Sequence, residues 1–397
     1  MYLTDLIEPL HARLVGVDAE FNSLSTDSRQ LRNGELFVAL RGDHFDGHDF
    51  ARAAVDRGAC AMVVEREIET ANVPQLIVAD STKALGIIGA LKRRHFDGQL
   101  VAVTGSSGKT SVKGLLREIF AVAGTVVATP GNFNNHIGVP LSLMSLTTQE
   151  YAVIEIGTNH PGEIAALVNL ARPNIALVNN VSAAHIAGFG SLAAIAREKG
   201  DIYSTLTERD TAIINLDDQF APQFIEATKH CRQIGFSLTD VAQPFPSMGA
   251  RNIKFDAAGR ASFELHYASD KVPVNLLLPG LHNVANALAA AACAMAAGVT
   301  DRLWEMAKTW ELPEGDVITA LPEYVVEDEL VSEAVPLLTE IEERLHQETA
   351  RVLAGAAARY RTEWLPQADW VELDGVGHCP QLDVPAVTAE LILGLTA

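Results

Sequence analysis

The segment VAVTGSSGKTS, residues 101–111, constrains the fold more than any other part of the chain. A short apolar run leads into a glycine-containing turn, and a helical pattern follows at once. Gly105 and Gly108 let backbone amides approach phosphate oxygens, and the helix N-terminus adds favourable partial charge. Lys109 can neutralise the β/γ-phosphates, and Thr110 can offer a hydroxyl to Mg²⁺. The segment predicts a phosphate-binding loop; the alternative is an ordinary strand–turn–helix corner with a chance lysine.

Strands and helices alternate along the chain after this loop. Apolar strands are predicted in VAVTG, TVVAT, YAVIEIG, IALVNNV and TAIINLDD, and helices at 109–123, 161–171 and 191–206. This alternation indicates a parallel sheet with helices on both faces, which is an α/β fold. Near 250–280 the pattern changes to a hairpin with Ala258-Gly259 in its turn, followed by an Ala-rich helix from His282 to about Ala297.

Residues 1–97 are predicted to form a separate, small α/β domain, and residues 98–300 the central domain. Short strands are expected at 36–40, 60–65 and 75–79, with helices over 48–57 and from about 81 to 94. Ser81 is expected to cap the second helix. The turn Asp97-Gly98 is the expected boundary.

The acidic charge is concentrated in one part of the chain. The 397 residues carry a formal charge of −20, and residues 301–397 hold 20 acidic but only 6 basic side chains. An acidic chain argues against a nucleic-acid or anionic-membrane partner. The sequence predicts no leader peptide, no membrane span and no paired cysteines. These expectations favour a cytoplasmic location. The uneven charge suggests that 301–397 is built differently from the rest.

Several polar residues follow predicted strands and so belong at one edge of the sheet. Glu155 ends one strand, and Asn180 and His185 follow the next. The carboxyl ends of parallel strands share the ligand crevice with the phosphate loop, so Glu155 could hold Mg²⁺ there. Taken alone, His185 would more often be structural, and Lys199 would be an ordinary helix lysine.

Two further segments are rich in polar residues. Residues 27–50 are dense in Asp, Arg, His and Gly, and residues 131–146 begin with three asparagines within five positions. Asn tolerates left-handed turns and offers amides to sugars and phosphates. Ligand-binding loops and plain polar turns explain these two segments about equally well.

Together these segments resemble the Mur ligases, the ATP-dependent amide ligases of peptidoglycan precursor synthesis. The resemblance covers about residues 20–300 in order. It is carried by TDSRQLRNGELFVALRGDHFDGHDF, VTGSSGKTSVK, GNFNNHIGVPLSL, AVIEIGTNHPGEIA, NNVSAAHIAGFGSLAAIAREKGDIY, IINLDD and LPGLHNVANALAA. The pairing of GSSGKTSVK with EIGTNHPGEI points to the branch that joins D-alanyl-D-alanine to UDP-N-acetylmuramoyl-tripeptide through an acyl phosphate.

The resemblance implies a role for each matching residue. The ATP-binding set would be Gly105, Ser106, Ser107, Gly108, Lys109, Thr110, Ser111 and Asn283. Mg²⁺ would be bound by Thr110, Glu155, His185 and Lys199, and the last three would also be catalytic. Lys199 matches a position that is carbamylated in many of these ligases. Lys109 would be catalytic as well, by neutralising the β/γ-phosphates. The UDP-linked substrate would meet Ser28, Arg29, Asp46, Gly47, His48, Asn132, Asn134 and Asn135. A monomer is expected.

The resemblance ends at about residue 300. These ligases have a third domain that closes over the site, and 301–397 shows none of its motifs. Residues 370–397 instead resemble the C-terminal piece of an α/β-hydrolase, with His378 at the triad histidine position. No G-x-S-x-G is present to supply a nucleophile, so hydrolase activity is not expected. The alternative to an active ligase is a truncated or chimeric protein that binds ATP and the UDP substrate with little turnover.

Overall fold

The computed structural model describes residues 1–42, 45–183, 189–239 and 244–299. The chain divides into two compact units, Met1–Glu314 and Gly315–Ala397. The predictions made for 301–397, including the hydrolase-like end and His378, lie outside the described residues.

A small sheet is built from residues 13–77. Its strand order is β1 (Arg13–Val15), β5 (Gln75–Ile77), β4 (Ala61–Val64), β3 (Leu36–Val38) and β2 (Leu24–Ser25). In this sheet, as far as the structure describes it, the β1–β5 pair is antiparallel and the other pairs are parallel. Successive residues of β4 enter different cores on the two faces. The accompanying helices are α1 (Thr4–Leu10), the 3₁₀ turn η1 (Gly47–Phe50) and α2 (Ala51–Asp56). The three predicted strands are confirmed, whereas the helix predicted over 48–57 is a 3₁₀ turn followed by a short α-helix.

Helix α3 (Ser81–Arg94) leaves this sheet and reaches the central sheet. Its N-cap is Asp80, whose carboxylate accepts from the Lys83 amide, so the prediction of Ser81 as the cap is wrong. Ser81 fails as a cap because its amide and hydroxyl both donate to Glu65. At the other end, Arg93 donates to the carbonyls of Ala171 and Arg172, which close a helix of the central region.

The central sheet has nine strands among the described residues. Its order is β14 (Asp270–Pro279), β13 (Arg260–Tyr267), β12 (Ser247–Phe255), β11 (Arg232–Ser237), β10 (Thr211–Asn215), β9 (Ile175–Val178), β6 (Gln99–Thr104), β8 (Tyr151–Glu155) and β7 (Val126–Ala128). Pairs from β7 to β12 are parallel, and β12–β14 form antiparallel hairpins at one edge. The predicted parallel sheet and hairpin are confirmed. The predicted boundary near residue 97 falls between the two sheets, and the division into domains at 97 and 300 stays a prediction.

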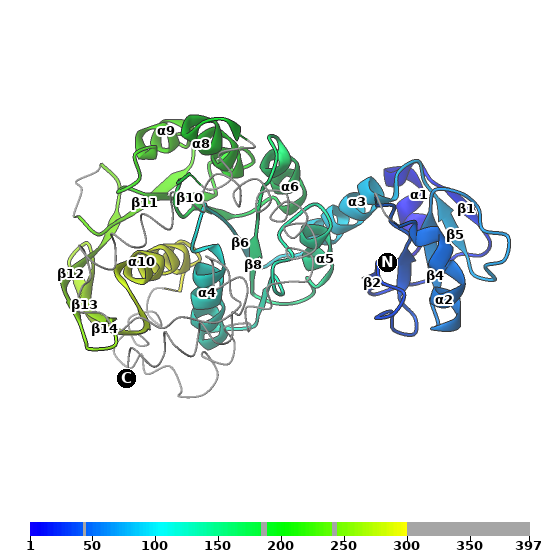
Figure 1. Cartoon of the computed structure of the whole chain (residues 1–397), viewed down its shortest axis with the longest axis horizontal. Coiled ribbons are helices and arrows are strands. Elements are labelled where there is room, and N and C mark those ends of the chain that lie inside the picture. Colours follow the sequence, from blue (N-terminus) through cyan, green and yellow to red (C-terminus); the bar gives the residue numbers. More distant parts are fainter. Residues whose placement is uncertain (43–44, 184–188, 240–243, 300–397) are drawn as a thin grey trace, which may run out of the picture. The chain divides into compact units, whose positions relative to one another are not determined.

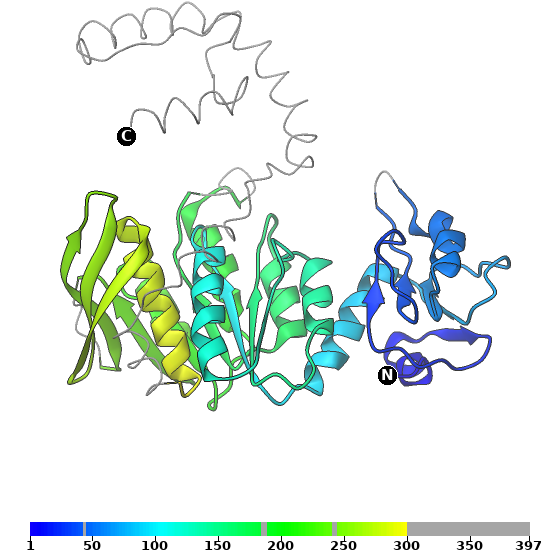
Figure 2. The same cartoon turned by 90° about the horizontal axis from the view of Figure 1, so that it is seen from below.

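Helices cover the central sheet on both faces (Figures 1 and 2). One face carries α4 (Lys109–Ala123) and α10 (Leu281–Ala296); the other carries α5 (Gly138–Met144), α6 (Glu163–Ala171), α8 (Leu192–Gly200) and α9 (Ala221–Ala227). Strand β6 shows the two-sided burial: Val101 and Val103 enter the first core, and Leu100 and Ala102 enter the second.

One ring contact and one correction to the predicted helices complete the central region. The ring of Phe120, near the end of α4, stacks on Tyr151 at the start of β8, with centroids 4.4 Å apart. The helix predicted over 191–206 ends at Gly200 and continues as the 3₁₀ turn η2 (Asp201–Tyr203). Within the described ranges, no helix is long and apolar enough to cross a bilayer.

Candidate active site

The loop between β6 and α4 requires glycine at residue 108. Gly108 has a φ of +76°, a conformation that L-residues avoid. A Cβ there would lie 2.5 Å from the Asn286 amide oxygen and 2.6 Å from the Asn179 amide nitrogen. The glycine therefore lets the loop pack against two asparagine side chains from other elements.

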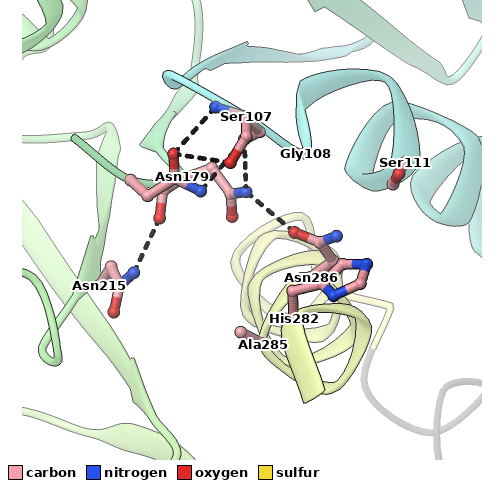
Figure 3. A pocket seen from close by; sticks show the side chains of 9 residues that line it. Ser107, Gly108, Ser111, Asn179, Asn215, His282, Ala285 and Asn286 are labelled. Carbon is pink, nitrogen blue, oxygen red and sulfur yellow. Dashed lines mark hydrogen bonds between the residues drawn. The ribbon is translucent and has the colours of Figure 1, made fainter. Parts of the chain in front are cut away.

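Asparagines following β9 hold the loop in shape (Figure 3). The backbone amides of Ser106 and Ser107 donate to the carbonyl and side-chain oxygens of Asn180, each at 2.9 Å. Asn179 donates to the Ser107 carbonyl at 3.1 Å and to Asn286 at 2.9 Å. The loop is thus ordered by the protein itself.

The N-terminus of α4 keeps unpaired amides. No acceptor within the described residues bonds the backbone amides of residues 108–110, as is usual for the first turn of a helix. These donors and the positive end of the helix dipole suit an anion.

A pocket of about 340 Å³ lies beside the loop. It is lined by Ser107, Gly108, Ser111, Asn179, Asn180, Asn215, His282, Ala285 and Asn286. Asn283 is 7% exposed and absent from this lining. It instead accepts from Asn286 at 3.0 Å and donates to the Pro279 carbonyl at 2.8 Å, which positions Asn286 against the loop.

The carboxylate of Glu155 is 2% exposed at the end of β8 and meets three side chains. Oε2 accepts from Thr110 Oγ1 at 3.1 Å and lies 3.1 Å from Lys113 Nζ. Oε1 accepts from Asn134 Nδ2 at 2.9 Å. A buried carboxylate needs such partners, so Glu155 joins β8 to α4 and to the asparagine-rich loop.

Two further lysines interact with each other in this region, the partly buried Lys109 and the buried Lys199. Lys109 Nζ donates to the Gly105 carbonyl at 2.9 Å, and its pKa is lowered by burial, against the opposing effect of Glu155. Lys199 on α8 is 2% exposed. Burial, helped by the charge of Lys109, lowers the pKa of Lys199 to about 8 despite the nearby Glu198.

The donor set suits Mg²⁺ in part. The Thr110 hydroxyl and the Glu155 carboxylate are hard oxygen ligands in contact with each other, and Mg²⁺ normally completes its shell with water and phosphate oxygens. His185 lies outside the described residues. Elsewhere in the described chain no three His, Cys, Asp or Glu side chains form a metal-binding cluster.

Of the residues predicted from segment 27–50, Asp46 and His48 form an ordered polar cluster with Glu65 and Arg66. His48 is buried, its Nε2 accepts from the Glu65 amide at 2.8 Å, and its Nδ1 lies 2.5 Å from Asp46. Because Nε2 accepts from the Glu65 amide, Nδ1 is the ring nitrogen that donates to Asp46. Burial alone would raise the pKa of Asp46, but hydrogen bonds from His48 and Arg66 outweigh it and hold that pKa well below its usual range.

The other predicted members of this set differ in exposure. Ser28 is buried, whereas Arg29 is exposed and forms a bidentate pair with Asp27. Gly47 packs directly on the Leu40 backbone, where a Cβ would meet the carbonyl oxygen at 2.6 Å.

The three asparagines of residues 132–135 have separate roles. Asn134 bonds Glu155, and Asn135 accepts from the amides of Ile137 and Gly138 at the start of α5. Asn132 accepts, through its carbonyl, from the amide of Asn134 at 2.5 Å. The structure thus brings Asn134 to the carboxylate and uses Asn135 to begin a helix.

Several site residues were not among those predicted. Lys113 follows Lys109 by one helical turn, so helical spacing could have indicated it. Asn179 is adjacent to Asn180 in the same motif. Asn286, His282 and Asn215 carry no comparable local signal, because only the packing of α10 and β10 brings them to the loop.

The fold and the loop define an α/β protein of the P-loop class, with a carboxylate beside the loop. The model of the Mur ligase middle domain matches residues 103–294, and that of the Mur ligase family catalytic domain matches residues 20–93. The chain belongs to the Mur ligase family.

Individual relatives agree with this assignment. The chain is 45% identical over 299 residues to the UDP-N-acetylmuramoyl-tripeptide–D-alanyl-D-alanine ligase of Escherichia coli, a match covering 75% of this chain and 65% of the relative. The Haemophilus influenzae ligase of the same name is 40% identical, over 74% of this chain and 64% of the relative. The chain therefore spans slightly less than two thirds of these curated relatives. The crystal structure of MurF from Acinetobacter baumannii superposes with a TM-score of 0.70 at 33% identity, covering 77% of this chain and 67% of that one.

Replacing Gly108 with alanine is expected to destabilise the protein. The positive φ and the close asparagine contacts should together cost about 2–4 kcal/mol. Gly114→Ala, in the same helix, is the matched control: no atom lies within 4 Å of its added Cβ, and the higher helix propensity should stabilise by about 1 kcal/mol. Urea unfolding measures both; equal effects would contradict the proposed packing of the loop.

Asp46→Asn is expected to lower stability at neutral pH by about 1–2 kcal/mol, because charged hydrogen bonds to His48 and Arg66 are weakened. A depressed carboxyl pKa contributes stability above the unfolded value and loses it as pH falls. The difference between wild type and variant should therefore be full at pH 6–7 and shrink below about pH 4. Urea unfolding at both ends of this range tests it, and a pH-independent difference would be inconsistent with the charge of Asp46 as the cause.

Proposed function

We propose that the chain is an ATP-dependent ligase that joins D-alanyl-D-alanine to UDP-N-acetylmuramoyl-tripeptide. The observation that carries this is the buried Glu155 carboxylate bonded to Thr110 at the start of α4, one residue from Lys109. Relatives that bear the name of this ligase match three quarters of the chain. A MurF ligase of Thermotoga maritima, solved in complex with ADP, superposes at 28% identity with a TM-score of 0.61.

The proposed reaction has two steps. The terminal carboxylate of the tripeptide attacks the γ-phosphorus of ATP, and the bond to the bridging oxygen breaks to release ADP and leave an acyl phosphate. The amine of D-alanyl-D-alanine then attacks the acyl carbon, loses a proton and displaces phosphate. Two anions must approach each other in the first step, so charge neutralisation is the main electrostatic requirement.

The described residues suit that requirement. Lys109 places a positive charge at the loop, where its ammonium donates to the Gly105 carbonyl; a phosphate oxygen would be a stronger acceptor. The free amides at the start of α4 would bind phosphate oxygens, and the pocket lined by Asn179, Asn215 and His282 is a candidate for the nucleoside. Residues Ser106, Ser107, Ser111 and Asn283 would support this nucleotide site.

Mg²⁺ would be held by Thr110 and Glu155, and by His185 and Lys199 as the resemblance implies. When bound, the ion offsets the negative charge of the phosphates. Lys199 needs conversion to a carbamate to act as a ligand: its neutral amine attacks CO₂, a C–N bond forms and a proton leaves to solvent. A lysine with a pKa of about 8 has a substantial neutral fraction near pH 8, which favours this step.

The UDP-linked substrate is proposed to bind Ser28, Arg29, Asp46, Gly47 and His48, together with Asn132, Asn134 and Asn135. His48, held by hydrogen bonds on both ring nitrogens, offers an ordered scaffold, and the exposed Arg29 offers a cation for a diphosphate. We further propose that the protein works in the cytoplasm as a monomer.

ADP release is the direct test of the proposed function. Release should require ATP, UDP-N-acetylmuramoyl-tripeptide and D-alanyl-D-alanine together. Lys109→Ala should weaken binding of a fluorescent ATP analogue by at least about tenfold, because a charged phosphate contact is lost. Lys229→Ala, an exposed lysine paired with Glu226, is the matched control and should bind normally. ATP binding without substrate-dependent ADP release would instead favour a Mur-like binding protein with little turnover.

The carbamate has its own test. In ¹³C-bicarbonate, wild type should show a carbamate carbon signal that weakens when the pH falls below about 7, because the amine of Lys199 becomes protonated. Lys199→Arg should lack the signal, and Lys229→Arg should keep it. A signal that persists in Lys199→Arg would assign the carbamate to another lysine.

A further inference from the structure

Lys113 is a buried cation with no part in the proposed reaction. It lies one turn after Lys109 on α4, and its side chain is only 8% exposed. Its ammonium contacts Glu155 Oε2 at 3.1 Å and donates to the Gly131 carbonyl at 2.5 Å. A lysine is rarely buried unless its charge is paired, and here the pair is the carboxylate proposed to bind metal.

The two oxygens of Glu155 are already in use in the structure. Oε1 accepts from Asn134, and Oε2 is shared between the Thr110 hydroxyl and the Lys113 ammonium. A divalent cation that binds Thr110 and Glu155 must therefore compete with a resident positive charge for the same oxygen.

The hydrogen bond to the Gly131 carbonyl keeps the Lys113 ammonium from moving away from the site. If a cation takes Oε2, the carbonyl of Gly131 still holds the ammonium near the site, because that bond does not involve Glu155. Repulsion between the ammonium and the cation persists in a site screened from water. Phosphate oxygens of a bound nucleotide would add negative charge and offset it.

We propose that Lys113 is an internal counter-ion of Glu155 that keeps divalent-cation affinity low until a nucleotide is bound. Metal then enters with the triphosphate rather than occupying the empty site. This proposal rests on the proposed assignment of Thr110 and Glu155 as metal ligands. Lys113 acts through Glu155 and is thus a positioning residue.

Mn²⁺ binding to the full chain, followed by electron paramagnetic resonance, tests the proposal. Without nucleotide, Lys113→Met should bind Mn²⁺ at least about tenfold more tightly than wild type, because a neighbouring positive charge is removed. Lys113→Arg keeps the charge and should stay within about threefold of wild type. With a non-hydrolysable ATP analogue bound, the difference in Mn²⁺ affinity between Lys113→Met and wild type should become smaller. If the Lys113–Glu155 pair only stabilises the fold, Lys113→Met should have the same nucleotide-free Mn²⁺ affinity as wild type. That result would overturn the proposal.

Two further measurements keep the outcome clear. Lys113→Gln retains a donor for Gly131 and replaces the Met variant if thermal unfolding shows that Met disrupts folding. In wild type, the analogue should strengthen Mn²⁺ binding by at least about tenfold, and equal affinity with and without it would refute the counter-ion role. Glu155→Gln, measured with the ATP analogue bound, separates the two hypotheses: if it leaves Mn²⁺ affinity unchanged there, the assignment of Glu155 as a metal ligand is wrong, whatever Lys113 does.

Discussion

The buried carboxylate of Glu155 is the interaction on which the arrangement of the site depends. An unpaired charge at the end of β8 would be strongly destabilising, so the surrounding elements must supply partners. Thr110 and Lys113 come from α4, and Asn134 comes from the loop before α5. The same contacts that stabilise the charge fix the helix that carries the phosphate loop.

The site also shows how an acidic chain can present local positive charge to the anionic substrates proposed for it. The whole chain carries −20, yet Lys113 contacts the Glu155 carboxylate, Lys109 interacts with that carboxylate, and Lys199 interacts with Lys109. Local charge, not net charge, sets the potential that a bound phosphate experiences. The negative net charge argues against a nucleic-acid partner for the whole chain. It does not conflict with the nucleotide proposed for this site.

Local sequence patterns predicted those parts of the fold that local physics decides. Helix α4 begins and ends as its spacing predicts, and the apolar strands are where alternation and length place them. Asp80, rather than Ser81, caps α3 because Glu65, sixteen residues away, binds Ser81. Asn286 reaches the loop only through the packing of α10, so no local pattern could place it there. His185 and 301–397 lie outside the described residues.

Helix α4 and strand β8 are joined at both ends, by the Phe120–Tyr151 stack and by the contacts of Glu155. Asn179 and Asn180 hold the connecting loop in addition. The entropy of ordering this loop is therefore lost when the protein folds, not when a ligand arrives. Association with a phosphate group would then need little conformational rearrangement at the loop, so the entropy of ordering the loop would not be subtracted from the binding free energy.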